Sequence, residues 1–82
     1  MLKTKGGVPV STRAVIARIN RALKPDYEML KITRGYRAQL DLGQYYILNY
    51  NRNFIRNHHV DPETVARELE VLADYEEVID EK

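Results

Sequence analysis

Apolar residues recur at helical spacing in a stretch near the start of the chain. Ser11 or Thr12 can act as the N-cap, because a hydroxyl accepts one of the unpaired N–H groups of a first helical turn. Pro25 cannot continue a helix, so the pattern predicts a helix that ends at about Lys24. At about 100° per residue, one side of this helix is apolar. The residues on that side are Val15, Ile16, Ile19, Ala22 and Leu23.

A second helix is predicted from a start signal near residue 61. Asp61 is suited to the N-cap, and Pro62 to the first helical position, where an N–H is not needed. The apolar residues expected to form a hydrophobic staple and a buried stripe are Val60, Val65, Leu69 and Leu72. No glycine or proline stops the helix afterwards, so residues 74–82 are predicted either to continue it or to form an acidic tail.

Strand patterns fill the middle of the chain. Residues 36–40 alternate apolar with polar side chains, which is typical of a half-buried strand. Gly43 is suited to a turn with positive φ, and residues 49–53 are rich in asparagine, which tolerates the left-handed region. The predicted strands cover residues 27–33, 36–40, 45–48 and 54–56.

This order of elements predicts an α+β fold of one helix, three or four antiparallel strands and a second helix. Both helices are expected on one face of the sheet, as a two-layer sandwich that shares one core. The single domain is expected to span residues 11–73. Residues 1–10 are predicted to be a flexible basic arm, and residues 74–82 an acidic C-terminal extension.

Length and composition narrow the class of protein. The chain has 82 residues and no cysteine. Its length allows one small domain without a deep cavity, and the lack of cysteine excludes disulfides, thiolate zinc sites and cysteine nucleophiles. No apolar run approaches the roughly 20 residues of a membrane span, and residues 1–7 lack the apolar core of a signal peptide. We therefore expect a cytoplasmic protein with no membrane partner.

The net charge of +1 conceals a strong polarity along the chain. Residues 1–60 carry 11 Lys or Arg against 3 acidic residues, a net charge of +8. Residues 61–82 carry 2 against 9, a net charge of −7. A basic body with an acidic end indicates binding to a charged partner.

One segment is similar to a nucleotide-binding loop. Lys5 to Thr12 matches the Gly-Gly and Ser-Thr pairs of the Walker A loop of partition-type ATPases. However, Val10 stands where the phosphate-binding lysine belongs, and Pro9 has no N–H to offer a phosphate oxygen. We therefore expect no bound nucleotide and no other cofactor.

Candidate catalytic and metal-binding residues are also explained by structural roles. His58 and His59 are adjacent, and adjacent residues of an extended chain point to opposite faces, so they are not expected to hold one metal ion together. Ser11 is accounted for by its role as a helix cap. The acidic residues Glu63, Glu68 and Glu70 are expected on the solvated face of the second helix. The sequence predicts no catalytic residue, no metal site and no enzyme.

Aromatic residues gather between residues 27 and 54. A structural interpretation puts Tyr46 and Phe54 in the core, with Tyr45 and Tyr50 over the outer face of the sheet. A functional interpretation joins the tyrosines to nearby Arg and Asn, because Arg pairs with phosphate, Tyr stacks on bases, and Asn hydrogen-bonds base edges or sugars. The candidate nucleic-acid-binding or partner-binding residues are Arg13, Arg18, Arg21, Lys24, Arg34, Arg37, Tyr45, Arg52 and Arg56.

Two functions therefore stay open for a small non-enzymatic binding module. The first is protein–protein interaction, either as a self-associating homodimer or as an adaptor whose acidic end meets a basic partner. The alternative is nucleic-acid binding through the basic first helix and the strand region rich in Arg, Tyr and Asn.

About 30 residues resemble a group of small uncharacterised prokaryotic α+β proteins. The chain reads Gly-Gln-Tyr-Tyr-Ile-Leu from Gly43, His-Val-Asp from His59, and Ala-Arg-Glu-Leu from Ala66. This resembles the group's "GxYYI" strand followed by an "HVD … AREL" helix. The resemblance implies an α+β fold and a bacterial origin, and it assigns no activity and no functional residue.

Overall fold

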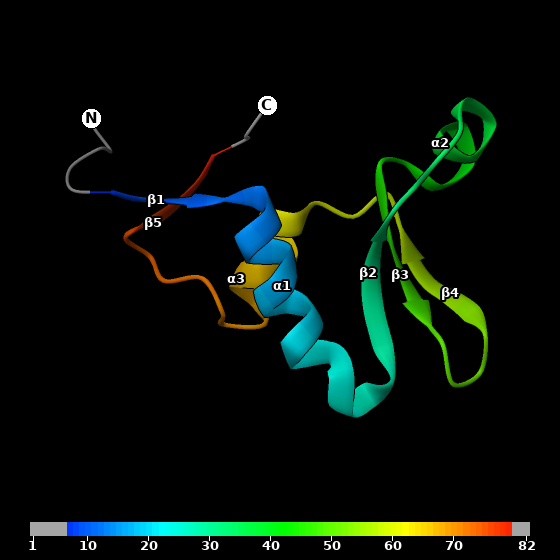
Figure 1. Cartoon of the computed structure of the whole chain (residues 1–82), viewed down its shortest axis with the longest axis horizontal. Helices are drawn as coiled ribbons and strands as arrows, with labels where there is room; N and C mark the ends of the chain where they lie inside the picture. The colour runs from blue at the N-terminus through cyan, green and yellow to red at the C-terminus, as the bar shows by residue number, and fades with distance from the viewer. Residues whose placement is uncertain (1–6, 80–82) are drawn as a thin grey trace.

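The computed structural model describes residues 7–79, and its α+β class confirms the prediction (Figure 1). Residues 1–6 of the predicted arm and residues 80–82 of the predicted extension lie outside the described residues. The helices are α1 (Thr12–Leu23), the 3₁₀ helix η1 (Lys24–Asp26), α2 (Tyr36–Leu42) and α3 (Pro62–Glu68). The strands are β1 (Val8–Ser11), β2 (Glu28–Ile32), β3 (Tyr45–Asn49), β4 (Phe54–His58) and β5 (Glu76–Ile79).

The strands form two separate sheets. The larger one is antiparallel, in the order β2-β3-β4. The smaller one pairs β1 with β5 in parallel and joins the two ends of the described chain. Two predictions are therefore wrong: residues 8–10 form a strand instead of part of an arm, and residues 76–79 form a strand instead of a helix or tail. Neither strand can be recognised from its own residues, because each one forms by pairing with a segment far away in the sequence.

Helix α1 contributes three of the eight buried core residues and begins as predicted. The Ser11 hydroxyl accepts a hydrogen bond from the Ala14 N–H at 3.1 Å and so caps the first turn. Val15 and Ile19 are fully buried on the apolar side of the helix. They pack in one cluster with Ile47 of β3 and with residues of α3 and β1.

Helix α2 replaces the strand predicted over residues 36–40. Ile32 of β2 already pairs with Tyr45 of β3, and the Thr33 N–H donates to the carbonyl of Gln44 at 2.9 Å. All of residues 34–43 are thus the connection between two paired strands, with no strand neighbour of their own. A short helix satisfies the backbone internally instead, and Gly43, at a φ of 77°, ends it.

Helix α3 starts at the predicted cap but is shorter than predicted. Its first turn is capped by Asp61, and it ends at Glu68 because the chain turns through Glu70, at a φ of 60°. Leu72, predicted as part of the helical stripe, is buried in the core from the segment that follows the helix. Figure 1 shows α1 and α3 close together beside β2, with α2 at the far end of the sheet. The predicted two-layer sandwich with both helices on one face stays a prediction.

Candidate binding surface

One face of the three-stranded sheet is not packed against the core. Leu30 and Ile47 are buried, so their neighbours along the strands point to the opposite face. The register agrees, since Met29 lies opposite Leu48 and Lys31 lies opposite Tyr46. We call this the outer face. Its residues are Met29, Lys31, Tyr46, Leu48, Ile55 and His58.

Two shallow hollows flank the outer face. The Tyr50 hollow has a volume of about 310 Å³ and is lined by Asn20, Lys24, Glu28, Met29 and Tyr50. The Tyr46 hollow has a volume of about 290 Å³ and is lined by Lys31, Ile32, Thr33, Arg34, Ala38, Leu42 and Tyr46. Each hollow thus combines a tyrosine ring with one or two cationic side chains and an apolar wall.

Thr33 stands in the wall of the Tyr46 hollow, but its hydroxyl is buried beneath the surface. Thr33 is 4% exposed, and its side-chain oxygen makes no hydrogen bond within residues 7–79. Its carbonyl accepts from the Gln39 side chain at 3.4 Å, which ties α2 to this edge of the hollow.

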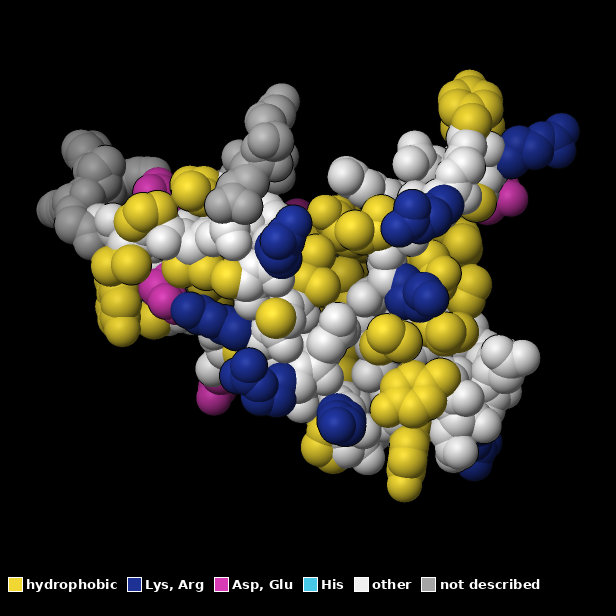
Figure 2. All heavy atoms as spheres, viewed as in Figure 1, with side chains coloured by type: hydrophobic (Ala, Val, Ile, Leu, Met, Phe, Trp, Pro, Cys, Tyr) yellow, Lys and Arg dark blue, Asp and Glu magenta, His cyan; other side chains and the backbone are white. Residues whose placement is uncertain are grey.

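Unpaired cations are spread from α1 and η1 to β2, α2 and the turn between β3 and β4. Seven of them are exposed and make no ion pair or hydrogen bond through their side chains within the described chain. They are Arg13, Arg21, Lys24, Lys31, Arg34, Arg37 and Arg52. Figure 2 shows Lys and Arg side chains along α1 and over β2 and α2, interleaved with hydrophobic ones, while the acidic side chains visible there lie toward the margins. The charge of this face is therefore available to an external anion.

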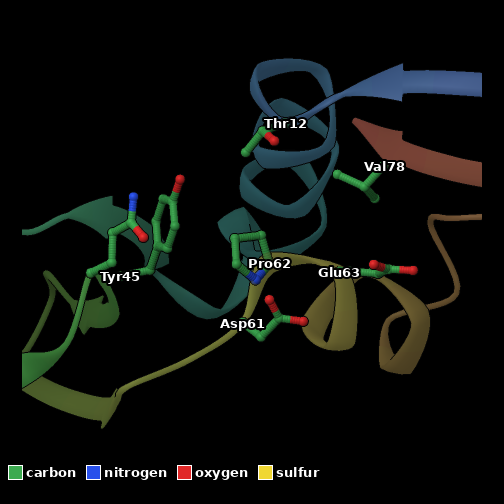
Figure 3. A pocket seen from close by; sticks show the side chains of 7 residues that line it. Thr12, Tyr45, Asp61, Pro62, Glu63 and Val78 are labelled. Carbon is green, nitrogen blue, oxygen red and sulfur yellow. The ribbon is translucent and has the colours of Figure 1, made fainter. Parts of the chain in front are cut away.

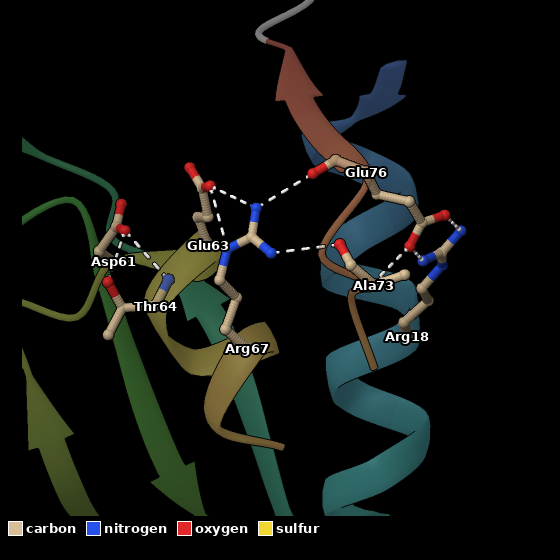
Figure 4. Close-up of polar contacts among 7 residues, drawn as sticks. All are labelled: Arg18, Asp61, Glu63, Thr64, Arg67, Ala73 and Glu76. Carbon is tan, nitrogen blue, oxygen red and sulfur yellow. Dashed lines mark hydrogen bonds and ion pairs between the residues drawn. The ribbon is translucent and has the colours of Figure 1, made fainter. Parts of the chain in front are cut away.

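Two of the predicted binding residues serve the fold instead. Arg18 forms a two-pronged ion pair with Glu76, at 2.8 and 3.1 Å (Figure 4), and also donates to the carbonyl of Val71. The hydrogen bond to Glu76 raises the pKa of Arg18 above its ordinary value. Arg56 pairs with the nearly buried Glu28 at 2.8 Å, and so the acid that lines the Tyr50 hollow is already neutralised.

The tyrosines occupy different positions from those predicted. Tyr45 packs against the core, and Tyr46 lies on the outer face, which reverses the structural interpretation of this pair. Phe54, predicted in the core, is 46% exposed on β4. Tyr50 is exposed as predicted and meets Tyr27 edge to face, with ring centroids 6.2 Å apart. Of these three tyrosines, Tyr46 and Tyr50 therefore line the hollows beside the outer face, whereas Tyr45 packs against the core.

Lys31, Thr33 and Tyr46 were not among the candidate binding residues predicted from the sequence. The signal that could have found them is the alternation of β2 around Leu30 and of β3 around Ile47. Either phase of Tyr45-Tyr46-Ile47-Leu48 presents one tyrosine and one aliphatic residue to each face. Only packing against α1 decides which phase is buried.

A third hollow, of about 300 Å³, lies between α3 and the ends of β3 and β5 (Figure 3). It has two acidic residues in its wall, but both are engaged. The Asp61 carboxylate accepts hydrogen bonds from the Thr64 N–H and hydroxyl, and Glu63 pairs with Arg67 at 3.0 Å. These carboxylates stabilise α3, so the hollow gives no reason to assign acid–base chemistry.

The two histidines approach one another more closely than the sequence suggested. His59 has a φ of 53°, and this left-handed turn brings its Nδ1 to 2.8 Å from the Nδ1 of His58. The expectation that their rings point apart is therefore wrong. Within residues 7–79, no group of three or more His, Cys, Asp or Glu side chains is arranged to hold a metal ion.

Comparisons with known proteins assign nothing further. No family model, no curated protein and no solved structure matches this chain. The resemblance to small prokaryotic α+β proteins stays a prediction. Among the helices of residues 7–79, none has the length and apolar character needed to cross a membrane.

Proposed function

We propose that this chain is a small, non-enzymatic nucleic-acid-binding module. The observation that carries the proposal is the set of seven unpaired, exposed cations, three of which (Lys24, Lys31 and Arg34) line two hollows that also contain a tyrosine. Phosphates supply most of the binding energy for basic side chains, and tyrosine rings supply stacking surface for bases.

The charge arithmetic favours the same function. Arg18 and Arg56 are used internally, yet seven of the described cations are still unpaired. An apolar protein partner would leave most of them without counter-charges. A polyanion neutralises a series of separated cations along one path, which fits a spread from α1 across β2 to α2.

A binding assay across salt concentrations tests the proposal. Fluorescence anisotropy of a labelled oligonucleotide should show binding whose logarithmic affinity falls linearly with the logarithm of salt concentration. The double variant Lys31→Ala/Arg34→Ala removes two exposed cations and should lower that slope by roughly 1.4–1.8. Its matched control, Lys31→Arg/Arg34→Lys, keeps both charges and should keep the slope. If neither RNA nor DNA binds at low salt, the proposal is wrong.

Self-association or another protein interaction is the second candidate function. It is favoured by β4, an edge strand whose five residues are all exposed, with Phe54 and Ile55 among them. Such an edge presents unpaired backbone groups to another chain. Sedimentation at increasing protein concentration distinguishes this function. A dimer that dissociates on Ile55→Lys substitution would support it.

A further inference from the structure

We infer that the outer face binds a single-stranded nucleic acid, with one base in the Tyr46 hollow and another in the Tyr50 hollow. This inference rests on the proposed function and adds to it the form of the nucleic acid and the place where bases are bound. Its basis is the arrangement of the two hollows on neighbouring positions of one strand.

The two hollows are adjacent because of strand geometry. Met29 lines the Tyr50 hollow, and Lys31 lines the Tyr46 hollow. These residues are two positions apart on β2 and share its outer face, so they lie about 7 Å apart. The Tyr50 hollow extends from β2 to Asn20 of α1 and Lys24 of η1, so a continuous extended strand that follows β2 can reach both hollows.

Each hollow contains partners for both parts of a nucleotide. In the first, Tyr46 lies directly across the strands from Lys31, so a base against the ring has its phosphate near a cation. In the second, Tyr50 is held by its edge-to-face contact with Tyr27 and remains 45% exposed beside Lys24. Stacking on aromatic rings next to cations is how sequence-tolerant proteins hold single strands.

A duplex does not use these features. Its bases are stacked inside the helix, so it meets the cations of this surface but leaves the tyrosine rings and the hollows without a ligand. Unpaired bases can be splayed out onto aromatic side chains. The same surface should therefore hold a single strand more tightly than a duplex of equal length.

The test compares four labelled probes of matched length and sequence: single-stranded RNA, single-stranded DNA and the corresponding duplexes. We expect a single strand to bind at least about tenfold tighter than its duplex. Tyr46→Ala and Tyr50→Ala should each weaken single-strand binding about tenfold, since stacking contributes about that factor per base. Their effect on duplex binding should be small.

Several variants separate stacking from charge and from loss of fold. Tyr46→Phe keeps the ring and should bind like the wild type. Tyr36→Ala is the matched control, because Tyr36 is 78% exposed on α2 and lines neither hollow. Tyr46→Ala should leave the salt dependence unchanged.

The outcomes of the two proposals are distinguishable. Equal or tighter binding of duplex, or full single-strand affinity in both tyrosine-to-alanine variants, would overturn the single-strand inference and leave nucleic-acid binding intact. Lack of binding to all four probes would overturn the proposed function itself.

Discussion

The chain divides into two regions that differ in how far their apolar side chains are buried. The helical region comprises residues 7–26 and 59–79, and the sheet region comprises residues 27–58. Six of the eight buried core residues belong to the helical region, whereas seven of the ten large exposed hydrophobics belong to the sheet region. The sheet region therefore contributes few of the buried core residues and most of the large exposed hydrophobic residues.

Charged residues divide less sharply, because Arg13, Arg21 and Lys24 of the helical region are unpaired within the described residues. In the same region, Arg18 and Arg67 join α1, α3 and β5 through Glu76, Glu63 and the backbone carbonyls of Ala73 and Glu76 (Figure 4), and Arg18 also donates to the carbonyl of Val71. In the sheet region, only Arg56 has an acidic partner, and Lys31, Arg34, Arg37 and Arg52 have none within the described residues. Surface that does not stabilise the fold is where a partner is expected to bind.

The largest expected effect is a difference in stability between two isoleucines, one in each region. Ile19 on α1 is fully buried, and Ile32 on β2 is 51% exposed. Ile19→Ala should lower the free energy of unfolding by about 2–5 kcal/mol, because it removes buried methyl groups and leaves a cavity. Ile32→Ala should cost about 1 kcal/mol or less. Chemical denaturation of both variants measures the difference.

Similar losses from both substitutions would mean that the sheet region packs as tightly as the helical region. The contrast in packing between the two regions would then be wrong. The exposed residues of the sheet region would contribute to stability as the buried ones do.

Local signals in the sequence were enough to predict the elements that depend on them. Ser11 and Asp61 cap α1 and α3 as predicted, since a cap needs only a side chain three residues before its donor. Gly43 takes the predicted positive φ. By contrast, β1 and β5 exist only through pairing across most of the chain, and neither has a pattern of its own. Long-range pairing cannot be read from a local pattern.

The candidate surface was predicted in part. Arginines were selected by their charge, yet charge alone cannot distinguish Arg18, which is tied to Glu76, from Arg21, which is unpaired. That difference depends on where β5 lies. The choice between Tyr45 and Tyr46 depends likewise on which phase of β3 faces α1, and the composition of the strand is nearly the same in both phases.

A smaller effect is expected at the junction of the two regions, where α3 begins. The Asp61 carboxylate accepts from the Thr64 N–H at 3.1 Å and from the Thr64 hydroxyl at 2.9 Å. Asp61→Ala should lower stability by about 0.5–2 kcal/mol, because a first-turn N–H loses its acceptor. Asp61→Asn keeps an acceptor and is the control. A thermal midpoint that does not move in the alanine variant would show that this cap adds nothing to stability.

The smallest expected effect is in the helical region, where a contribution of Glu76 to stability should be lost in acid. Hydrogen bonds from Arg18, and then from the Ala73 N–H, lower the pKa of Glu76 below its ordinary value of 4.5. A carboxyl whose pKa is lowered by folding stabilises the protein above its unfolded pKa, and that contribution is lost as the pH falls through the folded pKa. Glu76→Gln never has this contribution. The stability difference between wild type and variant should therefore be largest near neutral pH and shrink below about pH 4. Denaturation at a series of pH values measures it, with Glu68→Gln as the control for the change in net charge. A difference that stays constant from neutral to acid pH would show that the pair with Arg18 does not couple protonation to folding.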